Sequence, residues 1–384
     1  MGKVIYLDHG ATTKVDERVL NKMLPYFSMN YGNPSSAYFL GRRNRMVIVE
    51  AREVVASNIG AKSKEIYFTS CGSESDNLAL KGVAYANKYR GKHIITSKIE
   101  HPAVLNTCKT LEKQGFNVTY LNVDSKGFIK LDELENSIRL DTILISIMFA
   151  NNEIGTIEPI EQIGRIAKLN NVYFHTDAVQ AIGNIKIDVQ KLGIDLLSMS
   201  AHKFYGPKGI GALYVRNGID FERIQDGGHQ EKGKRSGTEN VAGIVGLAEA
   251  IKYAYKEVEY NNKIMNLRNY FITRLKEIER NVRINGDLEK RLIGNINVTF
   301  PNIDASELLL KLDEYGVCAS AGSACSTGDS KPSHVLTSIG LSKEEAFGTL
   351  RFTLGKENTK QEIDYAIMAL KNVLKAWKIR GFMV

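Results

Sequence analysis

A lysine at the end of a predicted strand is the first residue that could do chemistry. The motif Ser200-Ala201-His202-Lys203 follows the apolar run Ile194–Met199 and precedes a turn, residues 205–211, that is too rich in glycine to continue as a helix. A lysine in this position can lose enough solvation to become an amine that reacts with carbonyl groups. The chain holds 51 lysines and arginines, so an exposed lysine is the plainer interpretation of this motif taken alone.

An acid near the end of a neighbouring predicted strand favours a chemical role for Lys203 over that of an ordinary exposed lysine. Asp177 lies in the motif Phe174-His175-Thr176-Asp177-Ala178-Val179-Gln180. A buried carboxylate is costly unless it is paired, and one good partner is the ring nitrogen of pyridoxal phosphate (PLP), which must stay protonated for the ring to accept electrons. Gln180 could then reach the phenolic oxygen of that ring. Asp177 could instead cap a following helix, but a cap alone does not explain why this motif precedes a Ser-Ala-His-Lys motif.

A third motif could hold a phosphate group. The stretch Thr69-Ser70-Cys71-Gly72-Ser73-Glu74-Ser75-Asp76-Asn77 joins a predicted strand to a predicted helix through small residues. Free backbone N–H groups and a hydroxyl at a helix N-terminus bind phosphate well. An ordinary helix cap is an equally good interpretation of this stretch in isolation. Neither G-x-G-x-x-G nor G-x-x-x-x-G-K-[ST] occurs, so the dinucleotide-binding and P-loop motifs are excluded.

Cys325 is the fourth candidate, in a loop that spans residues 319–333. Its neighbours are Gly, Ser, Ala and Thr, which is typical of an exposed loop, whereas an unmodified cysteine usually lies among apolar residues. An exposed thiol invites oxidation, so we expect Cys325 to be functional. Cys71, Cys108 and Cys318 lie in regular or tight segments and are expected to be structural. No C-x-x-C pair occurs.

The elements that carry these motifs alternate between strand and helix. Such alternation predicts a mostly parallel sheet covered by helices on both faces, with ligands bound at the carboxyl ends of its strands. The predicted strands are Glu65–Ser70, His93–Ser97, Val118–Val123, Thr142–Ala150, Val172–Thr176, Leu196–Ser200 and Gly211–Val215. The predicted helices are Ser73–Tyr89, His101–Gly115, Leu131–Arg139 and Pro159–Asn170.

The C-terminal third has a different pattern. One long helical stretch, Val241–Arg280, is expected to link it to the first region. It is followed by shorter strands and helices, which predict a smaller α+β domain: Asn295–Phe300, Ala305–Tyr315, Val317–Ser320 and Lys360–Arg380. A length of 384 residues fits two domains.

Composition predicts a globular protein that works in the cytoplasm. The chain is 43% hydrophobic, yet it has no apolar run of the roughly 18–20 residues that a membrane helix requires, so no membrane partner is expected. The net charge of +8 permits acidic partners. The charges are scattered, however, and the densest cluster, Arg42-Arg43-Asn44-Arg45, is better explained as a solvated helix face than as a nucleic-acid site.

Taken together and in this order, the motifs resemble those of the NifS/IscS-type cysteine desulfurases, which are class V aminotransferase-like PLP enzymes of fold type I. The resemblance covers nearly the whole chain. Besides the motifs above it includes Tyr6-Leu7-Asp8, Gly32-Asn33-Pro34-Ser35-Ser36, Glu100-His101-Pro102-Ala103-Val104, Asn151-Asn152-Glu153-Ile154-Gly155, Arg235-Ser236-Gly237-Thr238-Glu239-Asn240, Gly322-Ser323-Ala324-Cys325 and Leu350-Arg351-Phe352. The chain departs from the family at His9-Gly10 and at Tyr38, and it has Gly72-Ser73 where the family often has Ala-Thr.

This resemblance implies a PLP-dependent transferase fold, with a large domain (residues 15–260) built on a seven-stranded, mostly parallel sheet. Residues 1–14 and 261–384 are implied to form the smaller domain that carries the cysteine loop. PLP is implied to be bound covalently by Lys203, stacked against His101, paired with Asp177 and contacted by Gln180 and Asn152. Its phosphate is implied to be held by Gly72, Ser73, Ser200, His202 and, from a second subunit, Thr238.

The implied reaction is the removal of sulfur from L-cysteine, which leaves L-alanine and a persulfide on Cys325. Lys203 is the implied acid and base, His101 is implied to help activate the thiol, and Asn152 and Arg351 are implied to bind the substrate. The resemblance also implies a homodimer and a sulfur-acceptor protein, either an iron–sulfur scaffold or a tRNA-thiolation enzyme.

Two alternatives remain open at this stage. One is a selenocysteine lyase or cysteine C–S lyase on the same scaffold, which has less need of the Cys325 thiol. The other is an inactive scaffold or a nucleic-acid-binding module, against which stand the complete set of Lys203, Asp177 and Cys325 and the lack of alternating aromatic and basic residues. The sequence leaves the identity of the sulfur acceptor and activity on selenocysteine undetermined.

Overall fold

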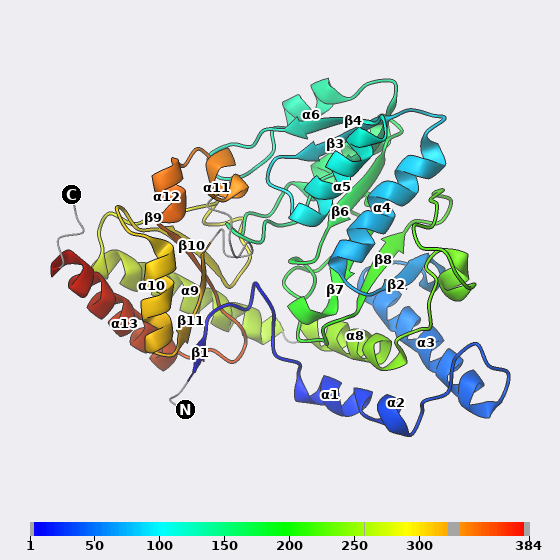
Figure 1. Ribbon diagram of the computed structural model, residues 1–384, viewed down its shortest axis with the longest axis horizontal. Coiled ribbons are helices and arrows are strands. Elements are labelled where there is room, and N and C mark those ends of the chain that lie inside the picture. The colour runs from blue at the N-terminus through cyan, green and yellow to red at the C-terminus, as the bar shows by residue number, and fades with distance from the viewer. Residues whose placement is uncertain (1–3, 257, 322–330, 380–384) are drawn as a thin grey trace.

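The computed structural model describes residues 4–256, 258–321 and 331–379 (Figure 1). Cys325 therefore lies outside the described residues. Within these ranges, none of the helices has the length and apolar character that a membrane crossing demands.

A seven-stranded sheet, in the order β2-β8-β7-β6-β5-β3-β4, forms the centre of the larger region. Neighbouring strands from β7 to β4 run parallel, and β8 is antiparallel to both of its neighbours. The mostly parallel seven-stranded sheet predicted above is thereby confirmed. Its strands are β2 (Ile66–Thr69), β3 (His93–Ser97), β4 (Asn117–Leu121), β5 (Thr142–Ser146), β6 (Tyr173–Asp177), β7 (Leu196–Ser200) and β8 (Gly211–Val215).

Helices cover both faces of this sheet (Figure 1), as the nearly continuous apolar character of its strands requires. On one face α4 (Gly72–Asn87) and α5 (Pro102–Lys113) pack their apolar side chains against alternate strand residues such as Ile94 and Leu144. On the other face α3 (Phe39–Asn58), α7 (Ile160–Leu169) and α8 (Val241–Ala254) pack against the intervening residues. Helix α6 (Leu131–Ser137) lies near β4 and α7.

A second, smaller core lies beside the first. A four-stranded sheet of order β12-β13-β10-β9 packs with three helices around Phe271, Phe300 and Phe352. Ile5 and Leu7 also belong to this core, because β1 pairs in parallel with β11. The elements are β1 (Ile5–Tyr6), α9 (Val258–Ile278), β9 (Arg283–Ile284), β10 (Asn295–Thr299), α10 (Ala305–Glu314), β11 (Val317–Cys318), β12 (Ser320–Ala321), β13 (Thr349–Thr353) and α13 (Lys360–Ile379).

We propose that these two cores correspond to the two domains expected from the sequence, residues 15–260 and residues 1–14 with 261–384. The distribution of the core side chains supports this division, since the core that contains Ile5 and Leu7 otherwise draws its buried residues from 264–374. The core around α3, α7 and α8 draws its buried residues from 19–251.

Some predicted elements were wrong in their extent. The stretch 241–280 is not one helix, because α8 ends at Ala254 and α9 begins at Val258. The predicted strand at 317–320 is divided between β11 and β12, which pair with different neighbours. Sequence reasoning did not predict β1, β9, β13 or the helices α1 (Glu17–Met23), α2 (Pro25–Ser28), α11 (His334–Ser338) and α12 (Lys343–Phe347), and of α3 it expected only a solvated helix face at residues 42–45.

Candidate active site

Three of the four predicted chemical motifs, all but the one around Cys325, lie in the described part of the chain and converge at one edge of the large sheet. Asp177 is the last residue of β6 and Ser200 is the last residue of β7, and a short 3-10 helix that ends at Lys203 follows directly. Gly72 begins α4 after β2, and His101 precedes the first residue of α5 after β3. The carboxyl ends of parallel strands meet at the same edge, where α/β proteins bind their ligands.

Lys203 is half-buried, and the N-terminal segment fixes its amine. The Nζ atom donates hydrogen bonds to the backbone carbonyl oxygens of Gly10 and Ala11, at 2.7 Å each. These two contacts hold the amine beside the sheet edge rather than in bulk solvent. The position matches the lysine expected at the end of a strand.

Asp177 is a buried acid whose position suits a cationic partner. Its Oδ1 accepts a hydrogen bond from the Val179 amide at 2.9 Å. Turns follow this residue rather than a helix, so the helix-capping alternative is wrong. Burial raises the pKa of the Asp177 carboxyl, while its electrostatic interactions with His101 and Lys203 act in the opposite direction. A cation that contacts this carboxylate would therefore stabilise its charged form.

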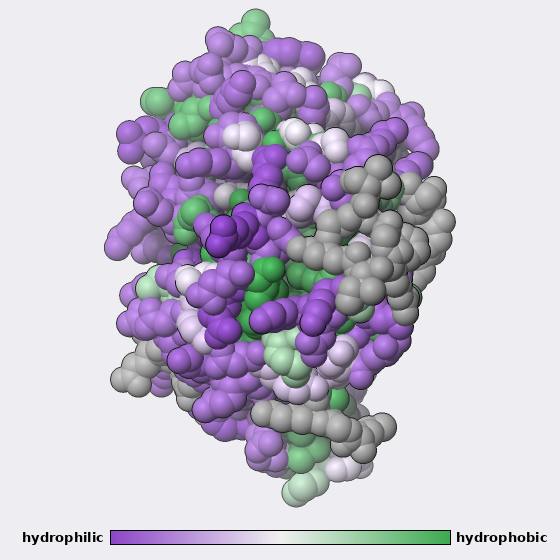
Figure 2. All heavy atoms as spheres, turned by 90° about the vertical axis from the view of Figure 1, so that its left-hand side faces the viewer, coloured by the Kyte–Doolittle hydropathy of each residue, from purple (hydrophilic) through white to green (hydrophobic). Residues whose placement is uncertain are grey.

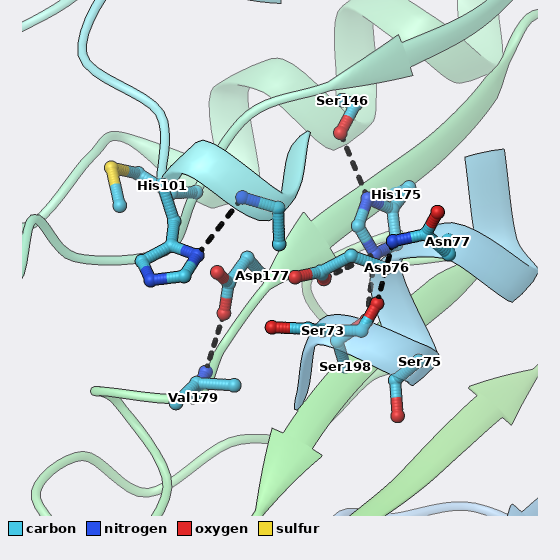
Figure 3. A network of polar contacts seen from close by, with 12 residues as sticks. Ser73, Ser75, Asp76, Asn77, His101, Ser146, His175, Asp177, Val179 and Ser198 are labelled. Atoms are coloured by element: carbon cyan, nitrogen blue, oxygen red, sulfur yellow. Dashed lines mark hydrogen bonds and ion pairs between the residues drawn. The ribbon is translucent and has the colours of Figure 1, made fainter. Parts of the chain in front are cut away.

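His101 caps α5 and faces the same space (Figure 3). Its Nδ1 accepts a hydrogen bond from the Ala103 amide at 3.1 Å, so the proton of the neutral ring lies on Nε2. Burial lowers the pKa of His101, which keeps the ring neutral near pH 7. One polar atom each of Asp76, His101 and Asp177 lie within 4.8 Å of one another.

A polar network that the sequence reasoning did not assign lies beside Asp177 (Figure 3). The His175 ring contacts the Ser146 hydroxyl through Nδ1 at 2.8 Å and the Ser198 hydroxyl through Nε2 at 3.0 Å. Its Nε2 also lies 3.7 Å from Asp76 Oδ1. Burial lowers the pKa of His175 to about 3. Burial, and then the charge of Asp177, raise the pKa of Asp76 well above its usual value.

His175 and Asp76 both lie in motifs that were quoted above for neighbouring residues, Asp177 and Ser73. Period-two alternation places His175 and Asp177 on the same face of β6, which was the available signal for His175. Asp76 had a weaker signal: it lies one helical turn after Gly72, on the buried side of α4.

The residues expected to bind phosphate lie around the start of α4. A Cβ atom added to Gly72 would lie 2.6 Å from Val179 Cγ2 and 3.6 Å from the Cβ of Ser200, so the helix start, β7 and the turn after β6 are in close contact. Ser73 is exposed in the first turn of α4. His202 Nδ1 contacts the Thr12 hydroxyl at 3.1 Å, and burial lowers the pKa of His202 to about 4.

Two predicted residues have other surroundings. The Gln180 amide donates to the Gly10 carbonyl oxygen at 3.0 Å, so it contacts the N-terminal segment that also holds Lys203. Thr238 is exposed on the segment before α8. Within this one chain, Thr238 does not join the cluster of Lys203, Asp177 and His101. This agrees with the resemblance, which assigned Thr238 to the site of a second subunit.

Arg351 is held on β13 by two oxygen acceptors. Its Nη2 pairs with Asp8 Oδ1 at 2.9 Å, and its Nη1 donates to the backbone carbonyl of Asn152 at 3.0 Å. The side chain is only 7% exposed. Arg351 and Asn152 are thus brought together, but the described contact uses the backbone of Asn152 rather than its side chain.

The described cysteines fit the structural role expected for them. Cys108 is buried in the α4–α5 core, where burial raises the pKa of its thiol to about 12. Burial also raises the pKa of Cys318 on β11. Because the thiolate is the nucleophilic form, both thiols are poorly reactive. Cys71 is half-buried at the start of α4.

Comparison with known proteins shows similarity along nearly the entire chain. The Aminotransferase class-V family model matches residues 5–366. The cysteine desulfurase IscS of Clostridium botulinum (strain Hall) is 52% identical over 378 residues, which is 98% of this chain and 95% of the relative. The cysteine desulfurase IscS of Methanosarcina thermophila is 53% identical over 374 residues, 97% of this chain and 92% of the relative.

Solved structures show the same relationship. A NifS-like protein superimposes with a TM-score of 0.92 at 42% identity, covering 97% of this chain and all of the other. A NifS-like protein from Rickettsia africae gives a TM-score of 0.88 at 34% identity, also over 97% of this chain. The fold expected from the resemblance is thereby confirmed. The chain belongs to the class-V aminotransferase family, within its NifS/IscS group of cysteine desulfurases.

Proposed function

We propose that this protein is a PLP-dependent cysteine desulfurase, a sulfurtransferase that converts L-cysteine to L-alanine and keeps the sulfur as a persulfide on Cys325. The observation that carries the proposal is the convergence of Lys203, Asp177 and His101 at the carboxyl edge of the sheet. The family relationship supports the same activity, since relatives that are 52–53% identical over nearly the full chain bear the name cysteine desulfurase.

The donor set at this edge fits PLP. Lys203 offers an amine to the aldehyde, the buried carboxyl of Asp177 suits a protonated ring nitrogen, and the neutral ring of His101 suits stacking. When bound, PLP supplies an electron sink that stabilises negative charge at the substrate Cα. Gln180 is half-buried beside Lys203 and is proposed to turn its amide to the phenolic oxygen.

The start of α4 is proposed to hold the phosphate. Gly72 and Ser73 contribute the first backbone amides of a 16-residue helix, whose N-terminus favours an anion. Ser200 lies against Gly72 and adds a hydroxyl. His202 is proposed to contribute its ring, and Thr238 is proposed to contribute its hydroxyl from the second subunit of a homodimer.

Arg351 is proposed to bind the substrate carboxylate, because a guanidinium fork can pair with a carboxylate bidentately. Asn152 is next to it and is proposed to contact both substrate and PLP through its side-chain amide. Once substrate occupies the site, the Lys203 Nζ is proposed to take the proton from the substrate Cα and to act as the acid in the following proton transfer.

Sulfur transfer is proposed to use the Cys325 thiolate. Its Sγ attacks the substrate sulfur, so that an S–S bond forms as the substrate C–S bond breaks. The electron pair of the broken bond stays with the carbon skeleton, which takes up a proton and leaves as alanine. His101, whose Nε2 carries the proton when the ring is neutral, is proposed to exchange protons with the thiol.

Substitution of the cysteine tests this proposal against a lyase that releases sulfide directly. Holoenzyme is incubated with L-cysteine labelled with radioactive sulfur, and both the alanine and the label on the protein are measured. Cys325→Ala is expected to retain PLP and lose labelling and alanine formation. Cys318→Ala, whose half-buried thiol lies on β11, is the matched control and is expected to keep both. Undiminished sulfide release by Cys325→Ala with dithiothreitol would favour the lyase.

The partner that accepts the sulfur is proposed to be an iron–sulfur scaffold protein or a tRNA-thiolation enzyme. The IscS name of the relatives makes the iron–sulfur branch the first to test. The cytoplasmic location expected from the sequence stays a prediction, which fractionation of the source cells would check.

A further inference from the structure

The segment from Asp8 to Ala11 contacts both ends of the proposed substrate site. Asp8 pairs with Arg351, and two residues later the carbonyls of Gly10 and Ala11 hold the Lys203 amine. An α-amino acid presents its carboxylate to the first of these groups and its amino nitrogen near the second. One short segment therefore touches the two groups whose separation the substrate must match.

This segment is fixed to the strand that carries Arg351. The His9 amide donates to the Thr353 carbonyl at 3.2 Å, and the Gly10 amide donates to the Thr353 hydroxyl at 2.6 Å. Thr353 lies two residues after Arg351 on β13, on the same face of the strand. Asp8 is consequently held in a defined place relative to the guanidinium.

Asp8 uses both of its carboxylate oxygens. Oδ1 accepts from Arg351 Nη2 at 2.9 Å, and Oδ2 accepts from the Ser320 hydroxyl at 2.7 Å. Ser320 is the direct cross-strand neighbour of Arg351 in the β12–β13 pair. The Ser320 bond fixes the rotation of the carboxylate, and the carboxylate in turn fixes the plane of the guanidinium.

Asp8 also balances the buried positive charge. Arg351 is nearly inaccessible, and a buried cation without a partner is strongly destabilising. The other acid nearby, Glu153, is fully buried and accepts a hydrogen bond from the Ser333 hydroxyl at 2.6 Å. Burial raises the pKa of Glu153 to about 7, against the opposing charge of Arg351. Among the residues that the structure describes, Asp8 is therefore the acid in direct ionic contact with the guanidinium.

We infer that Asp8 is a positioning residue that orients Arg351 for the α-carboxylate of the substrate, and that it thereby makes the enzyme select α-amino acids over amines that lack a carboxylate. This inference rests on the proposed function. Asp8 does not touch the substrate itself. It sets the orientation of the Arg351 guanidinium, which does. The chemical class recognised is an L-α-amino carboxylate, with the carboxylate as the selected feature.

A matched pair of unreactive ligands tests this role. L-alanine and ethylamine share an amino group and a methyl group, but only L-alanine carries a carboxylate. Their binding to the holoenzyme is measured by the change in visible absorbance, and KM and kcat for L-cysteine are measured in parallel. Asp8→Ala is expected to weaken L-alanine binding and raise KM by roughly 10- to 100-fold, because a charge-assisted hydrogen bond is lost. Ethylamine binding and kcat are expected to change by less than about threefold on the same reasoning.

Two further variants keep the inference testable if Asp8→Ala does not fold. Asp8→Asn retains an oxygen acceptor for Nη2 and is expected to recover most of the L-alanine affinity. Ser320→Ala removes only the bond to Oδ2 and is expected to weaken L-alanine binding several-fold without affecting ethylamine. Glu231→Ala is the control, because it breaks a buried pair with Arg52 at 2.6 Å, away from the site. It should leave the ratio of the two affinities unchanged.

The outcomes separate this inference from the proposed function. Equal weakening of L-alanine and ethylamine in the Asp8 and Ser320 variants, or no weakening of either, would overturn the positioning role. A wild-type protein that binds PLP but forms no alanine from L-cysteine would overturn the proposed function instead, whatever the ligand pair shows.

Discussion

Asp177 shows how burial and position together define a functional residue. The carboxyl is 7% exposed, ends a buried strand and has one backbone donor, Val179. A buried carboxylate with so little direct support is costly unless a ligand supplies the missing charge. Beside it, burial raises the pKa of Asp76 and lowers the pKa of His175, so burial disfavours a charge on both of these neighbours.

The first prediction concerns this charge. Asp177→Asn keeps an oxygen acceptor for the Val179 amide but removes the charge that pairs with the ring nitrogen. Removing one member of a buried pair costs about 3–5 kcal/mol, so PLP affinity should fall by roughly 100-fold or more. Absorbance titration with PLP measures it. Asp195→Asn, which alters the half-buried partner of Arg216 before β7, at the opposite end of that strand from Ser200, should bind PLP normally. Equal affinities for the two variants would contradict the role of Asp177.

The second prediction concerns pH and stability. Burial raises the pKa of Glu100 from 4.5 to about 8. Between these values the folded protein binds a proton that the unfolded chain releases, so this residue lowers the free energy of unfolding as pH rises, by about 1.4 kcal/mol per pH unit. Glu100→Gln keeps an oxygen for the Ser97 hydroxyl and the Met148 amide but cannot titrate.

Urea unfolding of wild type and Glu100→Gln at pH 6.5 and pH 8 checks this prediction. The apoprotein is used for both, so that cofactor release does not contribute. Wild type should lose more stability than the variant over this interval. A variant that loses as much stability as wild type would show that Glu100 does not retain its proton in the folded protein.

Sequence reasoning found the residues whose chemistry is unusual for their position and missed those whose importance comes from a partner. Lys203 and Asp177 end predicted strands, and that place is readable from the local pattern. The role of Asp8 depends on Arg351, 343 residues away in the chain, so no local pattern reveals it. His175 and Asp76 likewise meet only because α4 packs over β6.

At the scale of elements, the site depends on the close approach of the α4 N-terminus to the turn after β6. Gly72→Ala would place a methyl group 2.6 Å from Val179 Cγ2, too close for both to remain in place. Overpacking of this kind typically costs 1–3 kcal/mol. The helix start should shift, and PLP affinity should fall by roughly tenfold or more.

A second substitution provides the control for this third prediction. The double variant Gly72→Ala/Val179→Ala removes the methyl that clashes, so it should recover much of the PLP affinity. Val179→Ala alone should change the affinity little. If the double variant binds PLP no better than Gly72→Ala, the contact between these two residues does not set the phosphate site.

Elements with a strong hydrophobic pattern were predictable, and those with a weak one were not. The predicted bounds of β3, β7 and β8 match the structure residue for residue. The extent of helix α3 was not predicted, because four of its six buried residues are small or polar (Gly41, Asn44, Ala51 and Ala56) and only Ile48 and Val55 are large and apolar. Its arginines at 42, 43 and 45 are exposed, as expected for a solvated helix face.

At the scale of the whole molecule, the exposed apolar side chains are unevenly distributed. The side of the molecule where α10, α12 and α13 lie is largely hydrophilic (Figure 2). Many of the large exposed hydrophobic residues belong instead to α1, α2, α3 and the segment between α2 and α3: Leu20, Leu24, Phe27, Met29, Tyr31, Tyr38, Phe39, Met46 and Val49. Apolar surface of this extent is typical of an interface between subunits.

The fourth prediction is that this surface forms the homodimer. Phe27 and Phe39 are 63% and 65% exposed, so two glutamates there should disrupt association without affecting the core. Analytical ultracentrifugation of Phe27→Glu/Phe39→Glu should show a monomer with weaker PLP binding, because Thr238 could no longer be supplied by a second subunit. Leu140→Glu, at a fully exposed position elsewhere, should remain dimeric. A dimeric double variant would place the interface on another surface.

The central claim is that the Lys203 amine and PLP together release alanine from L-cysteine. The most direct test compares purified wild type with Lys203→Ala, each reconstituted with PLP. One sample of each is reduced with borohydride and denatured, and the near-ultraviolet absorbance of the protein is measured; an unreduced sample is assayed for alanine formed from L-cysteine. The account predicts that wild type keeps the reduced cofactor covalently attached at Lys203 and forms alanine, while Lys203→Ala does neither. A wild type that retains no attached cofactor, or a Lys203→Ala variant that forms alanine at the wild-type rate, would contradict it.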